Sequence, residues 1–537
     1  MATIQNPILK GFNPDPSIIR VGDDYYIATS TFEWFPGVQI HHSKDLRNWR
    51  LLTHVLTRKS QLDMLGNPDS GGIWAPCLSY SNGTFYLVFT DVKTHIGPFK
   101  DTPNYLVTAK DIRGPWSEPI YLNSSGFDPS LFHDDDGRKW LVNMVWDHRK
   151  GKNPFGGILL QEYDEKQKKL VGPIYNIFRG TELGLTEAPH IYKRNGYYYL
   201  MVAEGGTRWE HAVTLARSKS LFGPYEVDPE NPMLTAKDKP HLPLQKSGHA
   251  SIVETQNGDW YMVYLCGRPL PKSGKCNLGR ETAIQKVEWT EDGWLRVVGG
   301  GNDPSLTTPA PDLPEHPFPE ENKKEHFDHF DSNELNIHFN TLREPADESW
   351  LSLTERPGWL RLRGRHSFSS THGQSMVARR QQSFVIEAET VLEFEPDTFQ
   401  QMAGLVYYYN TRNYYYLRVS HDEELGKCIG IMTCDRGEYD EPLDRDISIE
   451  GWERVYLKLE VNYDDVQFYY SRDGKEWNAI GPVLDAGVIS DDNALESREG
   501  ILIDQGFTGA FIGLCAQDMS GRFLHADFDY FAYREKE

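Results

Sequence analysis

The sequence predicts an all-β protein with two domains in series, and three observations support this prediction. A short unit, in which a turn joins two apolar runs, recurs five times in residues 1–302, and residues 325–537 alternate apolar and polar side chains. The periodicity of long helices is absent from the sequence. Asn-Gly and Asp-Gly pairs between apolar runs indicate hairpins, because type I′ turns need positive φ at both central residues. We therefore expect a five-bladed β-propeller followed by a β-sandwich.

The repeated unit begins with a small or acidic residue, usually followed by proline, and continues through a glycine-bearing turn into an aromatic-rich strand. Its five copies begin at Asp15, Ala75, Asp128, Ala188 and His249. Successive copies lie 53 to 61 residues apart, which leaves room for about four short strands each, the size of a propeller blade. Five blades around one axis are the economical arrangement. The alternative is an irregular β-sandwich in which the copies resemble one another by accident.

A proline-rich stretch separates the two predicted domains. Six prolines punctuate residues 303–324, which show little periodicity. We expect this stretch to be a linker that lies against the surface. Beyond it, Val385–Val391 and Val455–Val461 alternate regularly enough to predict strands of a second domain over residues 325–537.

The charge and composition of the chain narrow its partners and its compartment. The 56 Lys and Arg against 78 Asp and Glu give a formal charge of −22, which makes nucleic acid and acidic membranes poor partners. No apolar run reaches the roughly 18 residues that span a bilayer, and no signal peptide is visible. We therefore expect a cytoplasmic protein. The six cysteines show no metal-ligand spacing, and no metal or cofactor is predicted.

Equivalent positions of the five units should lie at one level around the propeller axis. Three units begin with Asp15, Asp128 and His249, and Trp74 and Glu187 directly precede the other two. We expect these five side chains to converge at one end of the axis. Glycoside hydrolysis needs one carboxylic acid that protonates the leaving oxygen and one carboxylate that acts on the anomeric carbon, directly or through water. The three carboxylates therefore indicate a sugar-cleaving site.

Each of these residues also has a structural interpretation. Asp15 and Asp128 precede Pro-Ser, and their side chains could simply initiate turns. Glu187 could be an exposed acid at a strand end, His249 a buried core histidine, and Trp74 a packing residue between blades. The coincidence of all five at matching repeat positions favours a shared site, because independent surface turns have no reason to align.

Arg280 lies outside this alignment, between a glycine and an apolar strand. Most arginines form surface ion pairs, and this is one interpretation of Arg280. The other is that its guanidinium points inward and holds sugar hydroxyls and a neighbouring carboxylate. The residues alone leave both interpretations open.

Six ordered motifs resemble those of family 43 glycoside hydrolases, above all the two-domain β-xylosidase (xylan 1,4-β-xylosidase) branch. They are Asn13–Ser17, Gly72–Pro76, Phe127–Ser130, Thr186–His190, Gly248–Ser251 and Gly279–Thr282. The likeness extends to Glu204–Thr207 and to the tail Gly506–Phe511. It implies a five-bladed propeller that carries a lectin-like, concanavalin A-like sandwich, and hydrolysis with inversion of configuration.

The resemblance also implies a role for each residue that matches a family motif. Asp15 would be the general base that activates water, Glu187 the general acid, and Asp128 would orient Glu187 and keep its pKa high. A nearby carboxylate does disfavour ionisation of a second one. The substrate-binding residues implied are His249 and Arg280 beside the sugar, Trp74 and Trp146 as pocket walls, and Phe507 of the second domain as the group that closes the pocket.

The expected function is exo-acting release of D-xylose from the non-reducing ends of β-1,4-xylo-oligosaccharides, with α-L-arabinofuranosidase side activity. Alternatives are a dedicated α-L-arabinofuranosidase or arabinan-cleaving enzyme, and a non-catalytic sugar-binding propeller protein. Relatives suggest a homo-oligomer, a dimer or tetramer. Residues 267–278 form a shorter segment than this branch implies, so substrate preference is the open question. Some family members hold a divalent cation on the propeller axis near the counterpart of His249, which the sequence does not decide.

Overall fold

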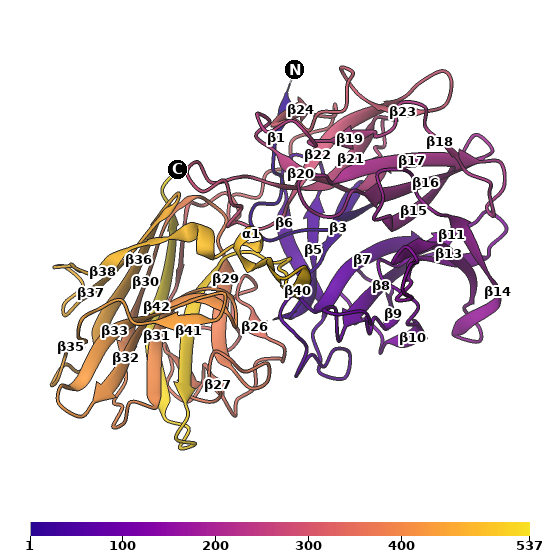
Figure 1. Cartoon of the computed structure of the whole chain (residues 1–537). Helices are drawn as coiled ribbons and strands as arrows, with labels where there is room; N and C mark the ends of the chain where they lie inside the picture. Colours follow the sequence, from indigo (N-terminus) through magenta and orange to yellow (C-terminus); the bar gives the residue numbers. More distant parts are fainter. Residues whose placement is uncertain (1) are drawn as a thin grey trace.

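Five small sheets around an axis and two larger sheets beside them make up the chain (Figure 1). The computed structural model describes residues 2–537. Over this range the helical segments are the 3-10 turn η1 (Ala486–Val488) and the four-residue α1 (Asp491–Ala494). In the described part of the chain, no helix has the length and apolar character needed to cross a membrane. The predicted all-β fold, a five-bladed propeller followed by a sandwich, is confirmed.

Each blade is an antiparallel sheet whose strands are contiguous in the chain. Blade one is β2 (Ser17–Val21), β3 (Asp24–Thr29), β5 (Gly37–Ser43) and β6 (Arg50–Leu56), and blade two is β7 (Gly72–Ser81), β8 (Thr84–Val92), β9 (Asn104–Ala109) and β10 (Ile120–Asn123). Blade three is β11 (Ser130–His133), β12 (Lys139–Trp146), β13 (Phe155–Asp164) and β14 (Lys169–Phe178), and blade four is β15 (Glu187–Arg194), β16 (Tyr197–Glu204), β17 (Ala212–Ser218) and β18 (Glu226–Val227), with β19 (Leu234–Thr235) beside β17. Blade five is β20 (Gln245–Glu254), β21 (Trp260–Gly267), β22 (Glu281–Trp289) and β23 (Leu295–Val297). Asn82 and Gly83 join β7 to β8 with positive φ at both residues, as a type I′ turn requires.

The first strand of each blade lies innermost, and contacts between these strands close the ring. Strands β2, β7, β11, β15 and β20 pack against one another in sequence, and β20 packs back against β2. Side-chain hydroxyls cross between neighbours: Ser17 Oγ accepts from Leu78 N at 3.0 Å, and Ser251 Oγ accepts from Ile18 N at 3.2 Å. These bonds satisfy backbone groups that face the axis, so the five blades form one closed body.

The five repeat positions share an unusual backbone conformation. The φ angle is 57° at Asp15, 39° at Ala75, 55° at Asp128, 53° at Ala188 and 53° at His249. Positive φ is uncommon for residues other than glycine, and such strain gathers at functional sites. The strand pairing shifts register next to three of these positions, a bulge that redirects side chains. The alignment expected from the repeats is therefore present in the backbone.

The second domain packs two antiparallel sheets face to face around one apolar core. In spatial order, the first sheet is β27 (Leu351–Ser352), β28 (Leu360–Arg363), β42 (His525–Glu535), β30 (Val385–Glu393), β36 (Val455–Asn462), β37 (Asp465–Ser471) and β38 (Asn478–Asp485), with β25 (Glu325–Asp328) beside β42. The second sheet is β29 (Ser375–Arg380), β41 (Phe511–Asp518), β31 (Gln401–Asn410), β32 (Asn413–Asp422), β33 (Gly426–Asp435) and β34 (Glu438–Asp440), with β35 (Ile447–Ser448) beside β33. The alternation predicted at Val385–Val391 and Val455–Val461 falls in β30 and β36.

The two domains share a buried apolar interface. Strand β4 (Trp34–Phe35) of the propeller pairs with β26 (Thr341–Leu342) of the sandwich. The indole of Trp34 is fully buried and stacks on Phe511 of β41, with ring centroids 3.8 Å apart. Burial of such large aromatic surfaces from both domains holds them in a fixed orientation.

The proline-rich stretch lies on the propeller. Strand β24 (Thr307–Pro309) pairs with β1 (Thr3–Gln5), His316 N donates to Asp45 Oδ2 at 2.7 Å, and Arg50 lies over the Phe318 ring at 4.7 Å. These contacts agree with a linker that follows the surface. The domain limits 1–302, 303–324 and 325–537 stay a prediction.

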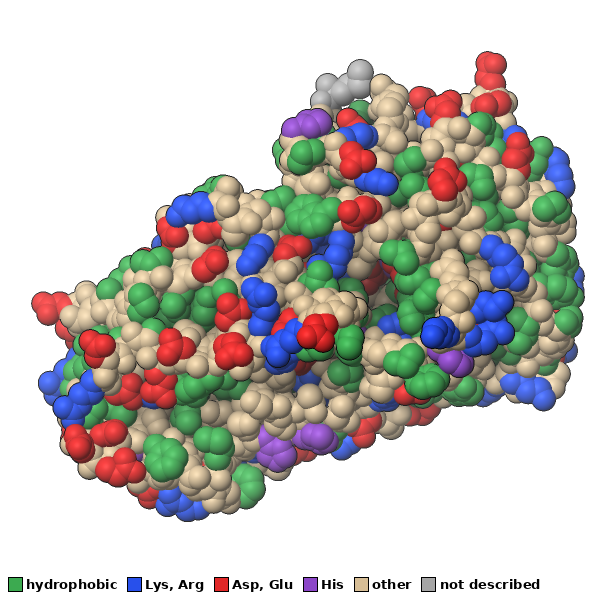
Figure 2. Space-filling view, viewed as in Figure 1, with side chains coloured by type: hydrophobic (Ala, Val, Ile, Leu, Met, Phe, Trp, Pro, Cys, Tyr) green, Lys and Arg blue, Asp and Glu red, His purple; other side chains and the backbone are tan. Residues whose placement is uncertain are grey.

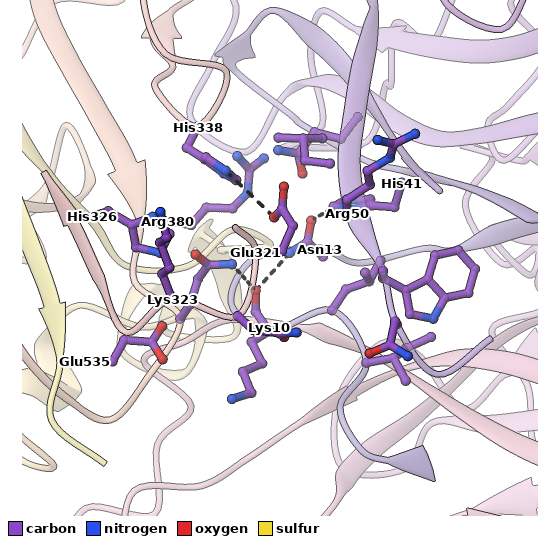
Figure 3. Close-up of a pocket in the computed structure, with 18 of the residues that line it drawn as sticks. Lys10, Asn13, His41, Arg50, Glu321, Lys323, His326, His338, Arg380 and Glu535 are labelled. Atoms are coloured by element: carbon purple, nitrogen blue, oxygen red, sulfur yellow. Dashed lines mark hydrogen bonds and ion pairs between the residues drawn. The ribbon is translucent and has the colours of Figure 1, made fainter. Parts of the chain in front are cut away.

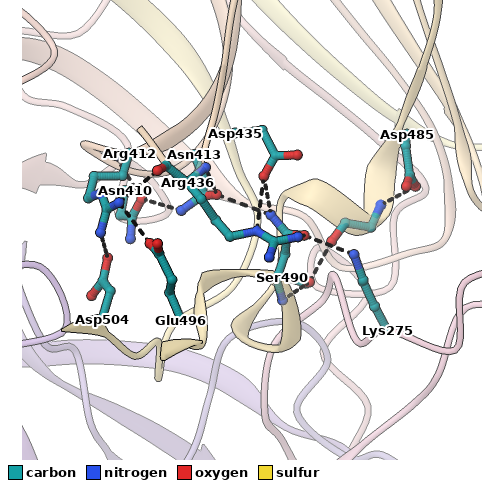
Figure 4. Close-up of polar contacts among 12 residues, drawn as sticks. Lys275, Asn410, Arg412, Asn413, Asp435, Arg436, Asp485, Ser490, Glu496 and Asp504 are labelled. Carbon is teal, nitrogen blue, oxygen red and sulfur yellow. Dashed lines mark hydrogen bonds and ion pairs between the residues drawn. The ribbon is translucent and has the colours of Figure 1, made fainter. Parts of the chain in front are cut away.

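A polar network fixes the segment that leads from the sandwich towards the propeller (Figure 4). This segment holds η1, α1, β39 (Glu496–Arg498) and β40 (Ile501–Asp504). Arg412 binds Glu496 at 2.8 Å and Asp504 at 3.2 Å, while Lys275 of the propeller donates to Asn493 Oδ1 at 2.8 Å. The segment is thereby tied to both domains just before the chain reaches Phe507.

Candidate active site

A pocket of about 410 Å³ opens where the inner strands of the propeller meet the sandwich. Figure 2 shows the molecule hollowed between the two domains. All eight residues that the sequence singled out line this pocket: Asp15, Trp74, Asp128, Trp146, Glu187, His249, Arg280 and Phe507. Side chains from positions 15 to 507 thus meet in one place.

Asp15 is buried and held from three sides. Ser30 Oγ donates to its Oδ2 at 2.6 Å, while Arg280 Nη1 and His249 Nδ1 approach its Oδ1 at 3.2 Å and 3.3 Å. Burial raises the pKa of Asp15, but these neighbours, Arg280 most strongly, outweigh burial and bring the pKa below its ordinary value. Asp15 is therefore an ionised carboxylate at neutral pH.

Glu187 and Asp128 have the opposite character. Burial, followed by the charge of Asp15, raises the pKa of Glu187 well above its ordinary value, although Arg280 and Lys100 oppose this. Burial, followed by Glu187 and Asp15, also raises the pKa of Asp128. Asp128 and Glu187 thus disfavour one another's ionisation, and the expectation that Asp128 keeps the pKa of Glu187 high stays a prediction. One ionised carboxylate thus faces two carboxyl groups that favour the protonated state.

Asp128 is fixed by the strand that carries Glu187. Its Oδ2 accepts a hydrogen bond from Ala188 N at 3.0 Å. Ala188 directly follows Glu187 at the start of β15, so Asp128 holds the backbone from which the Glu187 side chain projects. This bond links the Asp128 carboxyl group to the backbone next to Glu187.

Arg280 points inward and is only 4% exposed. Besides Asp15, its Nη1 donates to Thr207 Oγ1 at 2.8 Å, and its Nη2 donates to the carbonyl oxygen of Phe507 at 2.9 Å. The guanidinium carbon lies 5.5 Å from the ring centroids of both Phe32 and Phe507. Arg280 thus has the inward orientation, beside the carboxylate of Asp15, and its contact with sugar hydroxyls stays a prediction. One guanidinium joins the carboxylate of the first domain to the backbone of the second.

An aromatic wall from both domains closes the pocket. Phe507 of the sandwich stands edge-on to Trp74, with centroids 5.4 Å apart, and stacks with Phe32 at 6.0 Å. Ser70 fixes both rings, because its carbonyl accepts from Trp74 Nε1 at 2.8 Å and its Oγ accepts from Phe507 N at 3.0 Å. Aromatic faces beside polar groups suit a sugar, which presents apolar C–H faces and hydroxyl edges.

Trp146 comes from the end of β12 and lies beside Lys100. The Lys100 Nζ is 4.4 Å from the centre of the indole ring, and Trp146 Nε1 donates to the carbonyl of Pro98 at 2.9 Å. Burial lowers the pKa of Lys100 to about 8, although Glu187 opposes this. Lys100 thus adds a positive charge near the acid Glu187.

Both parts of the chain match described families. Residues 4–295 match "Glycosyl hydrolases family 43", and residues 327–534 match "Beta xylosidase C-terminal Concanavalin A-like domain". The chain belongs to glycoside hydrolase family 43. The predicted family and the concanavalin A-like nature of the sandwich are confirmed. The protein is therefore a glycosidase, and family 43 enzymes act with inversion.

Three relatives show how far this likeness extends. A β-xylosidase of Bacillus subtilis strain 168 is 54% identical, over 99% of this chain and 100% of its own. A xylosidase/arabinosidase of Humicola insolens is 52% identical, over 99% of this chain and 98% of its own. The crystal structure of a xylan β-1,4-xylosidase from Bacillus halodurans C-125 superposes with a TM-score of 0.96 at 61% identity, over 99% of this chain and 100% of that one.

The family 43 pocket also contains residues that the sequence did not single out. They are Phe32, Lys100, Phe127, Phe155, Leu185, Gly205–Arg208, Glu210, Leu502 and Gln505. Thr207 had a signal, because it belongs to the motif Glu204–Thr207. Lys100 and Leu502 lie away from the aligned repeat positions, so no periodicity could reveal them.

Glu204, the first residue of the motif Glu204–Thr207, stabilises the strand end next to the pocket. It is fully buried and accepts hydrogen bonds from the hydroxyls of Thr181, Thr186 and Thr214 at 2.6 to 2.8 Å. These bonds fix the end of β16, after which the chain turns to Thr207. Over residues 2–537, no three His, Cys, Asp or Glu side chains gather as a metal site.

Proposed function

We propose that this glycosidase is an exo-acting β-xylosidase that releases D-xylose from the non-reducing ends of β-1,4-xylo-oligosaccharides with inversion. The observation that supports this most directly is the pocket itself, in which Asp15, with a lowered pKa, and Glu187 and Asp128, with raised pKa values, lie beside an aromatic wall supplied by both domains. A neutral sugar fits such a site, because its hydroxyls bind the charged groups and its C–H faces pack on the rings.

In the proposed mechanism Asp15 is the general base. Its carboxylate takes a proton from a water molecule, whose oxygen attacks the anomeric carbon. The low pKa of Asp15 favours the ionised form that this step needs, and the bonds from Ser30 and Arg280 orient the carboxylate. An inverting pair should stand roughly 6.5–9.5 Å apart, so that the water fits between base and sugar.

Glu187 is the proposed general acid. It donates its proton to the glycosidic oxygen as the bond to the anomeric carbon breaks, and its raised pKa keeps that proton available near neutral pH. Asp128 is a positioning residue, because it holds Ala188 and with it the backbone of Glu187. We assign sugar contacts to His249 and Arg280, and apolar walls to Trp74, Trp146 and Phe507.

The proposed exo action follows from the closed end of the pocket. Phe507 reaches in from the sandwich and is fixed through Ser70 and Arg280, so that a chain entering the pocket meets a wall. A polymer cannot continue past such a wall, and only a terminal unit can occupy the reaction centre. Release of single xylose units is the expected result.

A second activity, on α-L-arabinofuranosides, is supported by the 52% identical relative named xylosidase/arabinosidase. A dedicated arabinofuranosidase or arabinan-cleaving enzyme is the competing assignment. Rates on paired aryl β-xylosides and aryl α-L-arabinofuranosides distinguish them, and a strong preference for the arabinoside would overturn our choice. A non-catalytic sugar-binding protein would be expected to lack one of the acids, whereas Asp15, Asp128 and Glu187 are all present.

The central test is digestion of xylobiose, xylotriose and polymeric xylan with product analysis. We expect xylose as the product from both oligosaccharides and slow release from the polymer. Proton NMR of the first-formed xylose should show the α anomer. Initial β-xylose would mean retention and would overturn the inverting mechanism.

We also propose that the enzyme works in the cytoplasm as a homo-oligomer, a dimer or tetramer. All six cysteines are free and buried, as is usual in a reducing compartment. The exposed rings of Tyr175 and Phe222, with centroids 4.7 Å apart, support self-association, because an exposed apolar patch commonly marks an interaction surface. Light scattering on the purified protein gives the mass, and a monomer at micromolar concentration would contradict the oligomer.

A further inference from the structure

A second cavity lies at the junction of the propeller, the linker and the sandwich, apart from the catalytic pocket. We call it the basic crevice; its volume is about 260 Å³. It is lined by seven Lys and Arg residues and two glutamates: Lys10, Arg47, Arg50, Lys323, Lys324, Arg379, Arg380, Glu321 and Glu535. Arg47 and Lys323 also pair with glutamates that do not line the crevice, Glu315 and Glu320. The other five basic residues still outnumber the two glutamates of the crevice, and this local excess of positive charge in a chain of formal charge −22 needs a physical reason.

Two arginines of the crevice are buried without a carboxylate partner. Arg379 and Arg380 are 4% and 5% exposed, and neither forms an ion pair with any described residue. Arg380 donates through Nε to Phe12 O at 2.6 Å and through Nη1 to Asn340 Oδ1 at 2.7 Å, both neutral acceptors. A buried charge is costly unless an opposite charge or a full set of hydrogen bonds compensates it.

Each arginine has one fully buried nitrogen that finds no hydrogen-bond acceptor. These atoms are Nε of Arg379 and Nη2 of Arg380, both buried. Arg379 uses its Nη2 to bind Gln382 Oε1 at 3.1 Å, and its guanidinium lies over the Tyr533 ring. Unsatisfied buried donors in a native structure commonly mark a bound water or ion.

The acids of the crevice do not neutralise it. The crevice has two glutamates against seven basic residues, and burial raises the pKa of both Glu321 and Glu535. Figure 3 shows Glu321 near the middle of the crevice, with Arg380, Arg50 and Lys323 around it. Three histidines that also line it have pKa values lowered by burial and are neutral: His41, His326 and His338.

We propose that the basic crevice binds one small polyvalent oxyanion of the phosphate type. The two free N–H groups come from different arginines, so they do not form the parallel fork that a planar carboxylate prefers. Lys10 of the N-terminal segment and Lys323 of the linker also line the crevice, and Lys323 Nζ is paired with Glu320. An anion with oxygens in several directions fits these donors, and once bound it ties propeller, linker and sandwich together.

The experiment measures binding of inorganic phosphate to the full chain by calorimetry at constant ionic strength and neutral pH. We expect saturable binding of one phosphate per chain. Lys10→Gln and Lys323→Gln should each weaken the affinity at least about fivefold, because each removes a nearby positive charge. Both lysines are exposed, so these variants should fold. Glu321→Gln should tighten binding, because it removes the competing acid.

The controls separate this crevice from other sources of binding. Lys166→Gln, which removes an equally exposed lysine from blade three, should leave the affinity unchanged. Citrate at matched ionic strength should bind more weakly than phosphate; tighter citrate binding would overturn the tetrahedral class. Phosphate should also raise the Tm of the wild type relative to chloride, and not that of the Lys10→Gln, Lys323→Gln double variant.

Three results would overturn the proposal. One is the absence of saturable binding. Another is equal affinity in wild type, Lys10→Gln and Lys323→Gln. The third is displacement of phosphate by xylose, which would place the anion in the catalytic pocket against Arg280.

Discussion

The catalytic pocket and the basic crevice both lie where the propeller meets the sandwich, but they use charge in opposite ways. Four acidic and three basic residues line the pocket, and its buried arginine is paired with Asp15. Seven basic residues and two acids line the crevice, and its buried arginines have no carboxylate partner. In the pocket, acids and bases of similar number set one another's pKa values beside a neutral sugar. In the crevice, the excess of basic residues attracts an anion. The same junction thus supports two kinds of recognition.

The largest effect should come from Glu187→Ala. We expect kcat on xylobiose to fall on the order of 10³-fold, because the leaving oxygen loses its proton donor. On aryl xylosides with good leaving groups the loss should be much smaller. Phosphate binding in the crevice should not change. Equal losses on both substrate types would contradict the general-acid role, since an activated leaving group needs little protonation.

Phe507→Ala should have the next largest effect. Loss of the ring opens the wall between Trp74 and Phe32, so we expect kcat/KM on xylobiose to fall between about tenfold and a hundredfold. Phe399→Ala is a matched control, because Phe399 is another sandwich phenylalanine, 57% exposed, that does not line the pocket. Unchanged kinetics in Phe507→Ala would show that the second domain adds nothing to the reaction centre.

Lys100→Gln should change the pH profile rather than the maximal rate. Activity needs Glu187 protonated, and the charge of Lys100 lowers the pKa of Glu187. Removal of this charge should raise that pKa and move the alkaline limb of the kcat/KM profile upward by about one pH unit. The acid limb, which reports Asp15, should stay in place because Lys100 does not influence its pKa. A shift of the alkaline limb to lower pH would contradict the assignment.

The smallest effect should come from Lys323→Gln, in the crevice. Its kcat/KM on xylobiose should stay within about twofold of the wild type, because exposed charges far from a reaction centre are screened. Steady-state rates at 0.15 M salt check this. A large loss of kcat/KM would mean that the crevice influences catalysis in the pocket and that the two cavities do not act independently.

The repeats made the propeller half of the pocket predictable. Asp15, Asp128 and His249 occupy one repeat position, so a single alignment placed them together and the shared positive φ agrees with it. Arg280 lies outside the alignment, and only the structure decided between its two orientations. Phe507 was placed by resemblance alone, because contacts between domains leave no periodic signal in a sequence.

The basic crevice shows a different limit of sequence analysis. The formal charge of −22 makes large anionic partners such as nucleic acid unfavourable. It does not bear on a small anion that binds one local site. Lys10 lies more than 300 residues before Lys323 and Arg380, and the three meet only after both domains have folded. The net charge of the whole chain therefore cannot reveal a local cluster of basic residues.

The bond between Arg280 and the carbonyl of Phe507 bears on how the enzyme is made. Ribosomes synthesise the propeller first, and Phe507 follows more than 200 residues after the last blade strand. A nascent or prematurely terminated chain can hold all three carboxyl groups and still lack the wall that completes the pocket and the acceptor that steadies Arg280. Full activity should therefore be reached only once Phe507 has been synthesised and packed against the propeller, so that unfinished copies are poor catalysts.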